Sequence, residues 1–432
     1  MIAPVRKNSF RPSTAVAVVI ANMVGTGVFT SLGFQLMDIQ SGFVIILLWL
    51  VGGIAALCGA LTYAELASAL PRSGGEYHFL SRLYHPAAGF ISGWISATVG
   101  FAAPSALAAI TFGKYLEAVF PGLSANWAAV CLILLLTAIH CFGHRSSSRI
   151  QSFFTLIKIL LILGFCLLAW VQVPHISNIS FIPVSGDGDL VLSGAFAVSL
   201  VYVNYAYTGW NAATYLTDEV ENPRENLPRI LFIGTVAVFV LYILLNVTFL
   251  LVAPVEAMIG QVEIGYITAK YAFGESGANL MGMILALLLV STVSAMIMAG
   301  PRVLRVIGED YSLFSWLAQK SRDEIPQRAI VVQSVLSLLM ILTASFEQIL
   351  LFSGFILALN SLFTVAGVFI LRSRQHKEGP CFKTPMFPLP PVVYLLITGW
   401  TLTYLLMQRP VEGLAGIGMI AAGGLLYKAA VR

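Results

Sequence analysis

Two short glycine-containing segments are the parts of this chain best suited to bind a small polar ligand. The first, Gly25-Thr26-Gly27-Val28-Phe29, lies in the middle of the first apolar run. The second, residues 205–211 (Tyr-Ala-Tyr-Thr-Gly-Trp-Asn), lies in the middle of the sixth. Because glycine lowers helix stability and permits unusual backbone angles, both segments are candidate helix breaks. For either segment alone, close packing of helices through small residues is the competing explanation.

Such breaks would expose backbone groups of opposite polarity. Unwinding the first helix frees N–H groups at the start of its outer half, at Thr26, Gly27 and Val28, where the helix dipole favours an anion. Unwinding the sixth helix frees carbonyl groups at the end of its first half, at Tyr205 and Ala206, which favour a cation. A ligand with a carboxylate and an ammonium on adjacent atoms suits both ends, and such a ligand is an α-amino acid.

The composition is that of an integral membrane protein. Of the 432 residues, 58% are hydrophobic and only 10% are charged, which leaves too little polar surface for a soluble domain. The apolar runs are each about 20 residues long, as a helix needs to cross a bilayer, whereas barrel strands would alternate. We predict an all-α membrane protein with twelve transmembrane helices, near residues 13–37, 42–70, 87–116, 126–142, 150–172, 190–217, 228–253, 276–304, 327–345, 349–371, 391–408 and 411–429.

These helices are expected to form one transporter domain over residues 1–432. Residues 13–172 make a first block of five helices, residues 190–371 a second block, and residues 391–429 the last two helices. Each block opens with a candidate broken helix, and an odd number of helices gives the blocks opposite orientations, as an inverted repeat requires. Interrupted helices at corresponding positions of two halves are typical of a transport site.

The distribution of basic residues predicts the orientation. Lys and Arg crowd the loops on the side of both termini, while the opposite loops hold only Lys114, Lys270 and Arg409. By the positive-inside rule, both termini are cytoplasmic in a multi-pass protein of the cell (plasma or inner) membrane. The first apolar run, residues 15–37, is too long for a cleaved signal and is expected to remain as the first helix.

Ionisable side chains within the predicted spans are few. Lys158 and Glu65 are the only well-buried charges that we expect there, and neither faces the breaks. Since a charged substrate side chain would need a charged partner, a neutral substrate is favoured. Glu65 is expected to pair with Arg72 or another basic residue, in a cytoplasmic gate or in a plain ion pair at the helix end. Tyr242 is expected to make interhelical hydrogen bonds.

No pattern in the chain indicates catalysis or a cofactor. The five cysteines include no CxxC pair, and the six histidines lie mostly in loops or at helix ends without an HExxH pattern. We therefore expect no metal, no other cofactor and no enzymatic activity. A channel would need rings of charge or a carbonyl filter rather than two opposed glycine breaks. The net charge of +4 is explained by the excess of Lys and Arg in the loops on the side of both termini, and no pattern indicates binding to nucleic acid.

Five motifs, in order along most of the chain, resemble the amino acid–polyamine–organocation (APC) superfamily and, within it, the L-type amino acid transporters. The last motif is the most specific of the five. The motifs are residues 25–29, residues 63–66 with 71–77 (Tyr-Ala-Glu-Leu and Pro-Arg-Ser-Gly-Gly-Glu-Tyr), residues 151–158, residues 205–211, and residues 221–228 (Glu-Asn-Pro-Arg-Glu-Asn-Leu-Pro).

The resemblance implies a leucine-transporter-type fold with twelve helices and a 5+5 inverted repeat. It also implies that Thr26 and Gly27 bind the substrate carboxylate, and that backbone groups of Met23, Tyr205 and Thr208 meet its ammonium. Tyr205 stands where the family places an aromatic gate. Thr208 replaces a glycine found in many L-type members, which narrows the pocket and favours small or branched aliphatic substrates over large aromatic ones.

Lys158 resembles the lysine that, in related transporters, occupies the place of a sodium ion between helices 1, 5 and 8. We expect its ammonium to tie the fifth helix to carbonyls of the first and to hydroxyls such as that of Thr292, so that transport is sodium-independent. If burial favours the neutral amine, proton coupling becomes possible; otherwise amino acid exchange is expected. The competing explanation is a lysine that extends to the cytoplasmic surface.

The sequence therefore predicts secondary active transport of neutral L-amino acids by alternating access, with the amino acid and the lipid bilayer as partners. A polyamine or cationic amino acid/amine exchanger of the same superfamily is the alternative, disfavoured by the lack of an acidic residue beside the breaks. Animal L-type members attach to a single-span glycoprotein through a cysteine in the loop after helix 3. The corresponding loop here, residues 114–127, has no cysteine, so no disulfide-linked heavy chain is expected.

Overall fold

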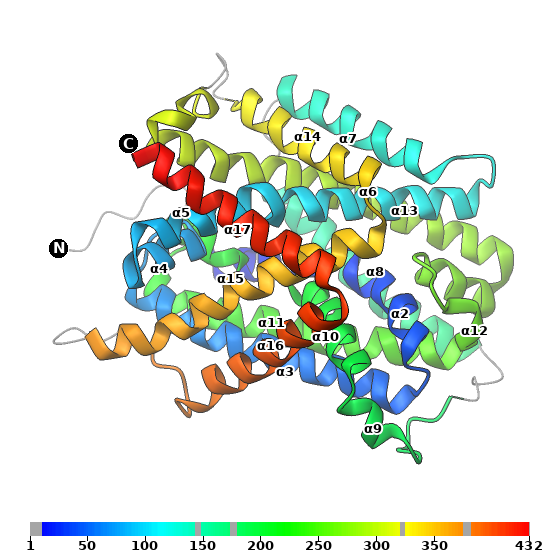
Figure 1. Ribbon diagram of the computed structural model, residues 1–432. Coiled ribbons are helices and arrows are strands. Elements are labelled where there is room, and N and C mark those ends of the chain that lie inside the picture. The colour runs from blue at the N-terminus through cyan, green and yellow to red at the C-terminus, as the bar shows by residue number, and fades with distance from the viewer. Residues whose placement is uncertain (1–10, 143–147, 173–178, 320–324, 375–381, 432) are drawn as a thin grey trace.

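The computed structural model describes residues 11–142, 148–172, 179–319, 325–374 and 382–431, with residues 148–154 described by their backbone alone. All regular secondary structure within these ranges is helical (Figure 1). In chain order the elements are α1 (Pro12–Met23), α2 (Gly27–Asp38), α3 (Gly42–Ala69), α4 (Gly75–Leu83), α5 (Pro86–Ile95), the π-helix η1 (Ser96–Gly100), α6 (Ala102–Val119), α7 (Ala125–Phe142), α8 (Ser148–Gln172), α9 (Asp187–Val191), α10 (Gly194–Tyr207), the 3-10 helix η2 (Ala212–Glu219), α11 (Pro223–Val252), α12 (Val255–Met258), α13 (Ile264–Asp310), the 3-10 helix η3 (Ser312–Leu317), α14 (Gln327–Thr343), α15 (Phe346–Arg374), α16 (Leu389–Gln408) and α17 (Pro410–Val431).

The described helices confirm an all-α, multi-pass membrane protein. Ten segments are long and apolar enough to cross a bilayer by length and composition. They are Pro12–Asp38, Gly42–Ala69, Pro86–Val119, Ala125–Phe142, Thr155–Gln172, Pro223–Val252, Ile264–Asp310, Phe346–Arg374, Leu389–Gln408 and Pro410–Val431. Two further apolar helices are shorter: α10 has 14 residues and α14 has 17.

Both predicted helix breaks are present. The helical backbone stops after Met23 and resumes at Gly27, so that α1 and α2 are two halves of one interrupted span. The second break follows Tyr207, where Thr208 takes extended angles (φ −56°, ψ 148°) and Gly209 has a φ of +103°. A positive φ of this size strains residues with a side chain, which explains why glycine occupies this turn.

The predicted helix over residues 276–304 begins at the right place but ends too early. α13 consists of two helical segments that meet at a kink at Gly274 (φ 71°, ψ −173°), and the second segment continues past residue 304 to Asp310. Pro301 lies inside this segment, within the predicted bounds. Proline is tolerated within membrane helices because neighbouring helices satisfy the freed backbone groups.

The interrupted helices lie inside the bundle, surrounded by the longer ones. Half-helix α1 packs against α8 and α11, while α2 packs against α10, and α10 also contacts α3, α15 and α16. The terminal helix α17 crosses α15 and α5 on the outside (Figure 1). Accordingly, 67% of the most apolar window of Pro12–Asp38, which contains the first break, is buried, against 11% for that of Pro410–Val431. Most residues of α10, up to Tyr207 at the second break, are buried as well. The fold therefore places both breaks in the interior of the bundle.

Candidate functional site

The two helix breaks touch each other in the interior. A Cβ atom added to Gly27, the first residue of α2, would lie only 2.5 Å from the Cα atom of Ala206 in α10. The Tyr242 hydroxyl of α11 spans the contact, donating to the carbonyl oxygens of Met23 at 2.5 Å and of Ala206 at 3.0 Å. The first break therefore lies against the end of α10, and a third helix fixes the two together.

A second contact joins the same segments one turn away. A Cβ atom on Gly209 would lie 2.8 Å from the carbonyl carbon and oxygen of Asn22, near the end of α1. Glycine at both 27 and 209 is thus required by close backbone approach, which is one reason that glycine recurs at ligand sites. The tyrosine predicted as a gate, Tyr205, lies with its hydroxyl beside the Thr26 side chain.

Backbone donors at the start of α2 are free. Gly25 donates to Met23 O at 2.8 Å and Phe29 to Thr26 O at 3.0 Å, but in the described chain no acceptor faces the N–H groups of Thr26, Gly27 and Val28. Three adjacent donors at a helix N-terminus form an anion site. The structure therefore supplies the donor half of the predicted ligand site.

The carbonyl half is different, because these oxygens already accept hydrogen bonds. Tyr205 O accepts from the Thr208 N–H at 3.0 Å and from the Thr208 hydroxyl at 2.6 Å. Ala206 O and Met23 O both accept from Tyr242. Met23 O also accepts from the Gly25 N–H at 2.8 Å, so Met23 O and Tyr205 O each have two donors, whereas Ala206 O keeps a second lone pair for a cation.

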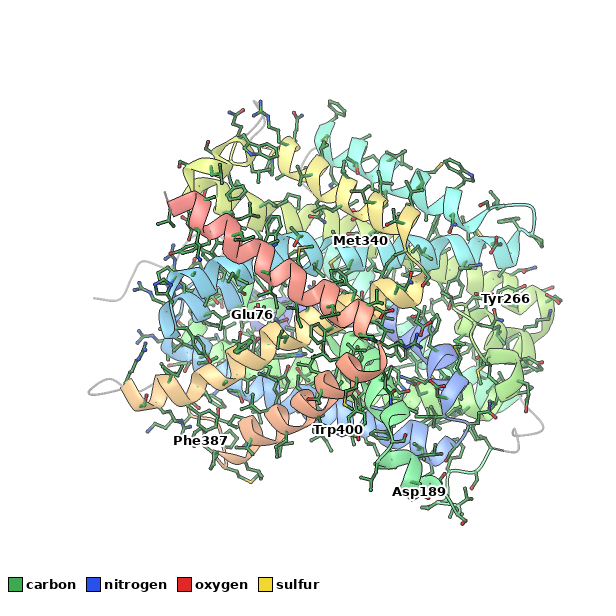
Figure 2. The ribbon with its side chains drawn as sticks, viewed as in Figure 1. Glu76, Asp189, Tyr266, Met340, Phe387 and Trp400 are labelled. Carbon is green, nitrogen blue, oxygen red and sulfur yellow. The ribbon has the colours of Figure 1, made fainter. Side chains whose placement is uncertain are left out.

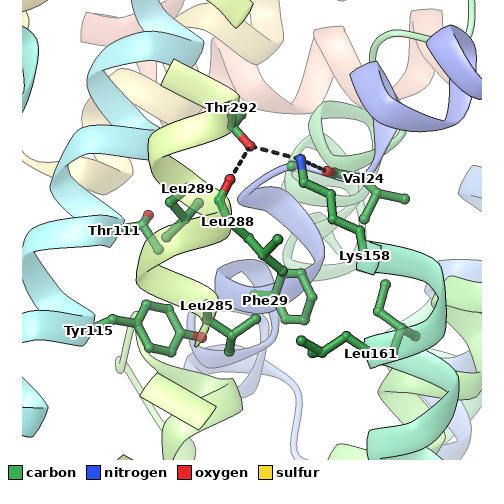
Figure 3. Close-up of a pocket in the computed structure, with 12 residues that line it drawn as sticks. Val24, Phe29, Thr111, Tyr115, Lys158, Leu161, Leu285, Leu288, Leu289 and Thr292 are labelled. Atoms are coloured by element: carbon green, nitrogen blue, oxygen red, sulfur yellow. Dashed lines mark hydrogen bonds between the residues drawn. The ribbon is translucent and has the colours of Figure 1, made fainter. Parts of the chain in front are cut away.

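Lys158 joins three helices beside the first break. Its side chain is 7% exposed, and its ammonium donates to Val24 O at 3.3 Å and to the Thr292 hydroxyl of α13 at 3.0 Å (Figure 3). The Thr292 hydroxyl in turn donates to Leu288 O at 3.2 Å. The ammonium is buried among acceptors instead of reaching the surface, so the alternative of a surface-seeking lysine is wrong.

Lys158 and Thr292 separate two small cavities. Figure 3 shows the first, which is lined by Val24, Gly25 and apolar side chains of α2, α8 and α13, with Tyr115 of α6 at its side. The second, on the other side of the ammonium, is lined by polar groups that include Asn22 and Ser291. Neither cavity is lined by Tyr205, Ala206 or Thr208, so both of these cavities lie on the Lys158 side of the first break.

Comparison with known proteins decides the identity of this helical scaffold. A family model described as "Amino acid permease" matches residues 10–422. The chain belongs to the amino acid permease family. This confirms the resemblance to the APC superfamily and its L-type members that the five motifs indicated.

Two relatives cover nearly the whole permease. The chain is 30% identical over 445 residues to the human protein "Large neutral amino acids transporter small subunit 2", with 96% of this chain and 78% of that protein aligned. It is 25% identical over 433 residues to the mouse "b(0,+)-type amino acid transporter 1", with 96% and 86% aligned.

Glu65 is buried in the permease and paired, but its partner is Arg372 rather than Arg72. The Glu65 carboxylate is 1% exposed and accepts two hydrogen bonds from the Arg372 guanidinium of α15, at 2.8 and 2.9 Å. The backbone N–H of Thr384 adds a third bond of 2.8 Å. This bidentate pair and the Thr384 bond join α3 to α15 and to the loop before α16. The two residues of the pair are too far apart in the sequence for their pairing to be predicted from it.

The expectation that Lys158 and Glu65 account for the buried charges missed Glu76. Its side chain is 2% exposed in α4, and Figure 2 labels it among the helices of the bundle. The carboxylate accepts hydrogen bonds from the Tyr63 hydroxyl at 3.0 Å, from the Asn211 amide and from the Tyr215 hydroxyl. The prediction that no acidic residue lies beside the breaks is therefore wrong, because Asn211 belongs to the second break. Residues 71–77 fall between the predicted helices 42–70 and 87–116, and in the structure Gly75–Leu83 forms the additional helix α4, which buries Glu76.

Aromatic and charged side chains close the end of the bundle where α2, α10 and α15 meet. The Phe34 ring stacks on Tyr202 at 5.9 Å and on Phe346 at 5.6 Å between centroids. The Tyr202 hydroxyl donates to Glu347 at 2.8 Å, and Arg409 pairs with the same carboxylate at 2.9 Å. These contacts join α2, α10 and α15 at this end of the bundle.

Proposed function

We propose that the permease carries neutral L-amino acids across the cell membrane by secondary active, sodium-independent transport with alternating access. The observation that carries this proposal is the contact between the two breaks, which sets the free N–H groups of Thr26, Gly27 and Val28 beside the carbonyl end of α10. Half-helix ends that meet at the centre of a bundle are the usual substrate site of such carriers.

The proposed site assigns a part of the substrate to each group. The carboxylate binds the free donors of residues 26–28, because helix N-termini favour anions. The ammonium binds the carbonyl oxygens of Met23, Tyr205, Ala206 and Thr208, and at the first three it shares or replaces the present donors. Gly25 leaves room for the ligand, since the nearest atom to an added Cβ is Met23 O at 3.9 Å. Tyr205 is the gate over the bound substrate.

Two features favour a neutral side chain on the substrate. The human relative is named for large neutral amino acids. Within the permease, the carboxylate nearest to the second break, Glu76, already accepts three hydrogen bonds and is not free to bind a cation. An exchanger of polyamines or cationic amino acids is the alternative, and the position of Glu76 beside Asn211 is the observation that favours it.

Lys158 supports the absence of sodium coupling. Its ammonium is bound to Val24 O and Thr292, where a bound cation would otherwise join the first, fifth and eighth spans. We infer that the lysine replaces the ion and that transport proceeds as amino acid exchange or with proton coupling. Glu65, with Arg372, belongs to the cytoplasmic gate.

The proposed architecture adds α10 and α14 to the ten candidate spans, which gives twelve helices. Residues 13–172 and 190–371 would be the two inverted repeats, residues 391–429 the last pair, and both termini would be cytoplasmic. The scaffold requires no cofactor and no enzymatic chemistry. We propose a carrier of the plasma or inner membrane.

Association with a larger protein is a separate question. The human relative is named a small subunit. In the permease the turn between α6 and α7 contains no cysteine, so we propose that any companion binds without a disulfide at this loop.

Uptake into proteoliposomes tests the function. Radiolabelled alanine and leucine are offered with and without internal amino acid, at pH 5.5 and 7.5, in sodium-free buffer. Uptake that needs internal amino acid identifies an exchanger, and acid-stimulated uptake into empty vesicles identifies a proton-coupled importer. If neither amino acid enters while labelled putrescine or arginine does, the neutral substrate is wrong and the alternative holds.

A further inference from the structure

Glu76 has a role that the transport site alone does not explain. Its carboxylate takes hydrogen bonds from three elements: Tyr63 on α3, Asn211 in the second break, and Tyr215 on η2. We propose that Glu76 is a positioning residue, which fixes the unwound segment after α10 and holds the cytoplasmic side of the permease closed. The claim about the closed cytoplasmic side rests on the proposed function, whereas the claim that Glu76 fixes the segment after α10 does not.

The carboxylate is held by neutral donors only. In the described part of the chain, Glu76 forms no ion pair with Lys or Arg. Hydrogen bonds to a charged acceptor are about twice as strong as bonds between neutral groups, and a buried carboxylate that loses its donors is costly. Loss of the bonds from Tyr63, Asn211 or Tyr215 would therefore leave a buried carboxylate with fewer donors, which is costly.

The backbone of α4 is shaped to approach η2. Gly75 begins α4 with a φ of +52°, and a Cβ atom there would lie 2.9 Å from the Tyr215 ring. Just before it, the Ser73 hydroxyl accepts from the Asp218 N–H at 2.9 Å, and the Ser73 N–H donates to the Asp218 carboxylate at 3.4 Å. The segment from residue 73 to residue 76 thus contacts η2 at Tyr215 and Asp218, and the preceding turn at Asn211.

The same short helix also reaches the end of a long span. The Tyr77 hydroxyl donates to the Asp310 carboxylate at 2.6 Å, at the last residue of α13. The helix α13 also carries Thr292, which accepts a hydrogen bond from Lys158. The short helix α4 therefore contacts both the second break and α13. Glu76 is the buried centre of this set of contacts.

The consequence for transport follows from the chain order. Asn211 comes three residues after Thr208, so whatever holds Asn211 also limits how far the carbonyl end of α10 can move. Opening of the cytoplasmic side requires η2 and α4 to separate, and therefore requires the bonds to Glu76 to break. Weakening these bonds shifts the permease towards the state that is open to the cytoplasm.

Two variants weaken the hydrogen bonding around Glu76 with little change in side-chain shape. A third variant is the matched control. Glu76→Gln keeps the size of the side chain but removes the charge and one acceptor. Tyr215→Phe removes one donor. Tyr84→Phe, at the end of α4, removes a hydroxyl that bonds to Phe363 O at 2.8 Å and does not touch Glu76.

Hydrogen–deuterium exchange of the purified, full-length permease in detergent tests, without any transport assay, whether Glu76 fixes the segment after α10. We expect peptides covering residues 208–219 to exchange at least about tenfold faster in Glu76→Gln and Tyr215→Phe, the change expected from losing one hydrogen bond to a charged group. Peptides of α17, and all peptides of Tyr84→Phe, should match wild type. Unchanged exchange at residues 208–219 in both variants overturns the inference, whether or not the wild type transports amino acids.

Leucine uptake into right-side-out and inside-out vesicles then separates positioning from a general loss of folded protein. If Glu76 holds the cytoplasmic side closed, both variants raise KM at the outer face and lower it at the cytoplasmic face. An equal fall of Vmax in both directions with unchanged KM values assigns Glu76 a structural role only and also overturns the inference. Failure of the wild type to transport leucine in either vesicle bears on the proposed function, while the exchange result still decides the role of Glu76.

Discussion

The ammonium of Lys158 donates a hydrogen bond of 3.0 Å to the hydroxyl of Thr292, and so joins α8 to α13. The same ammonium reaches Val24 O at 3.3 Å, at the first unwound residue after α1. One buried charge thus joins the break that is proposed to bind substrate to two helices that surround it. Movement at the break must change at least one of these bonds, which makes Lys158 the natural place for coupling.

Lys158→Met should therefore slow amino acid exchange strongly. Methionine replaces the apolar stem of the side chain but lacks the terminal ammonium, so it cannot donate to Val24 O or to Thr292. Losing a hydrogen bond from a charged group costs about 1.5–3 kcal/mol, or roughly tenfold or more in an equilibrium. We expect at least this loss in the initial rate of proteoliposome uptake, and a pH profile unlike that of the wild type. Thr292→Val, which leaves the charge and the bond to Val24, serves as the control and should lose less. A Lys158→Met variant with unchanged rate and unchanged pH profile would contradict a coupling role.

Gly27 and Gly25 offer a matched test of the contact between the breaks. An added methyl group at Gly27 meets backbone atoms of Ala206 at 2.5 Å, which side-chain movement alone cannot relieve, whereas at Gly25 the nearest atom is 3.9 Å away. Overpacking of this kind typically costs about 1–3 kcal/mol. Gly27→Ala should lower the thermal midpoint of the detergent-solubilised permease and abolish uptake. Gly25→Ala should leave the midpoint near wild type and change only KM, because its methyl group enters the space proposed for the ligand. Equal midpoints for the two variants would mean that α2 and α10 do not pack as closely as the structure shows.

The sequence predicted those features that depend on local composition. Glycines within long apolar runs indicated both breaks, and a single lysine in an apolar helix indicated Lys158, because each is unusual for its immediate surroundings. The partners were not predictable in the same way. Arg372 lies 307 residues from Glu65, and both sit at helix ends where many basic residues are available.

Glu76 and the full extent of α13 show what local reasoning leaves out. The residues around Glu76 are polar, so they resemble a solvated loop, and their burial arises only when α4 folds against η2 and α3. The prediction carried α13 through Pro301 but missed the segment from Ile264 to the kink at Gly274 and the last turns up to Asp310, where neighbouring elements extend the helix. Tertiary packing decided both cases.

His78 should make the stability of the permease fall in acid. Burial, with repulsion from Arg72 and Arg82, lowers the pKa of His78 from its ordinary value of 6.5 to about 4, while Asp218 opposes this shift more weakly. Between pH 6.5 and 4 the unfolded chain therefore binds a proton that the folded chain does not, so stability decreases as the pH falls through this window and is unaffected by His78 above it. We expect the thermal midpoint of the wild type to drop more between pH 7.5 and 5 than that of His78→Gln. At pH 7.5 His78 is neutral in both the folded and the unfolded chain, so the difference in thermal midpoint between the two proteins reports packing alone and serves as the internal control. Parallel shifts in both proteins would show that other groups account for the acid sensitivity.

Thr208→Gly should widen the range of substrates. The Thr208 hydroxyl donates to Tyr205 O at 2.6 Å, so its side chain is fixed at the end of α10, where the substrate side chain is proposed to lie. Removing it opens space and leaves Tyr205 O with one donor, the backbone N–H of residue 208, so that its second lone pair can accept from the ammonium. Each methylene that a pocket can accept is worth about 1–3 kcal/mol in discrimination. Phenylalanine and tryptophan should then compete with labelled leucine in Thr208→Gly but not in the wild type. Thr208→Ser keeps the hydroxyl and loses only the methyl group, so it should behave as an intermediate. Strong competition by phenylalanine in the wild type would instead show that the threonine does not limit the pocket, and would place the side chain of the substrate away from residue 208.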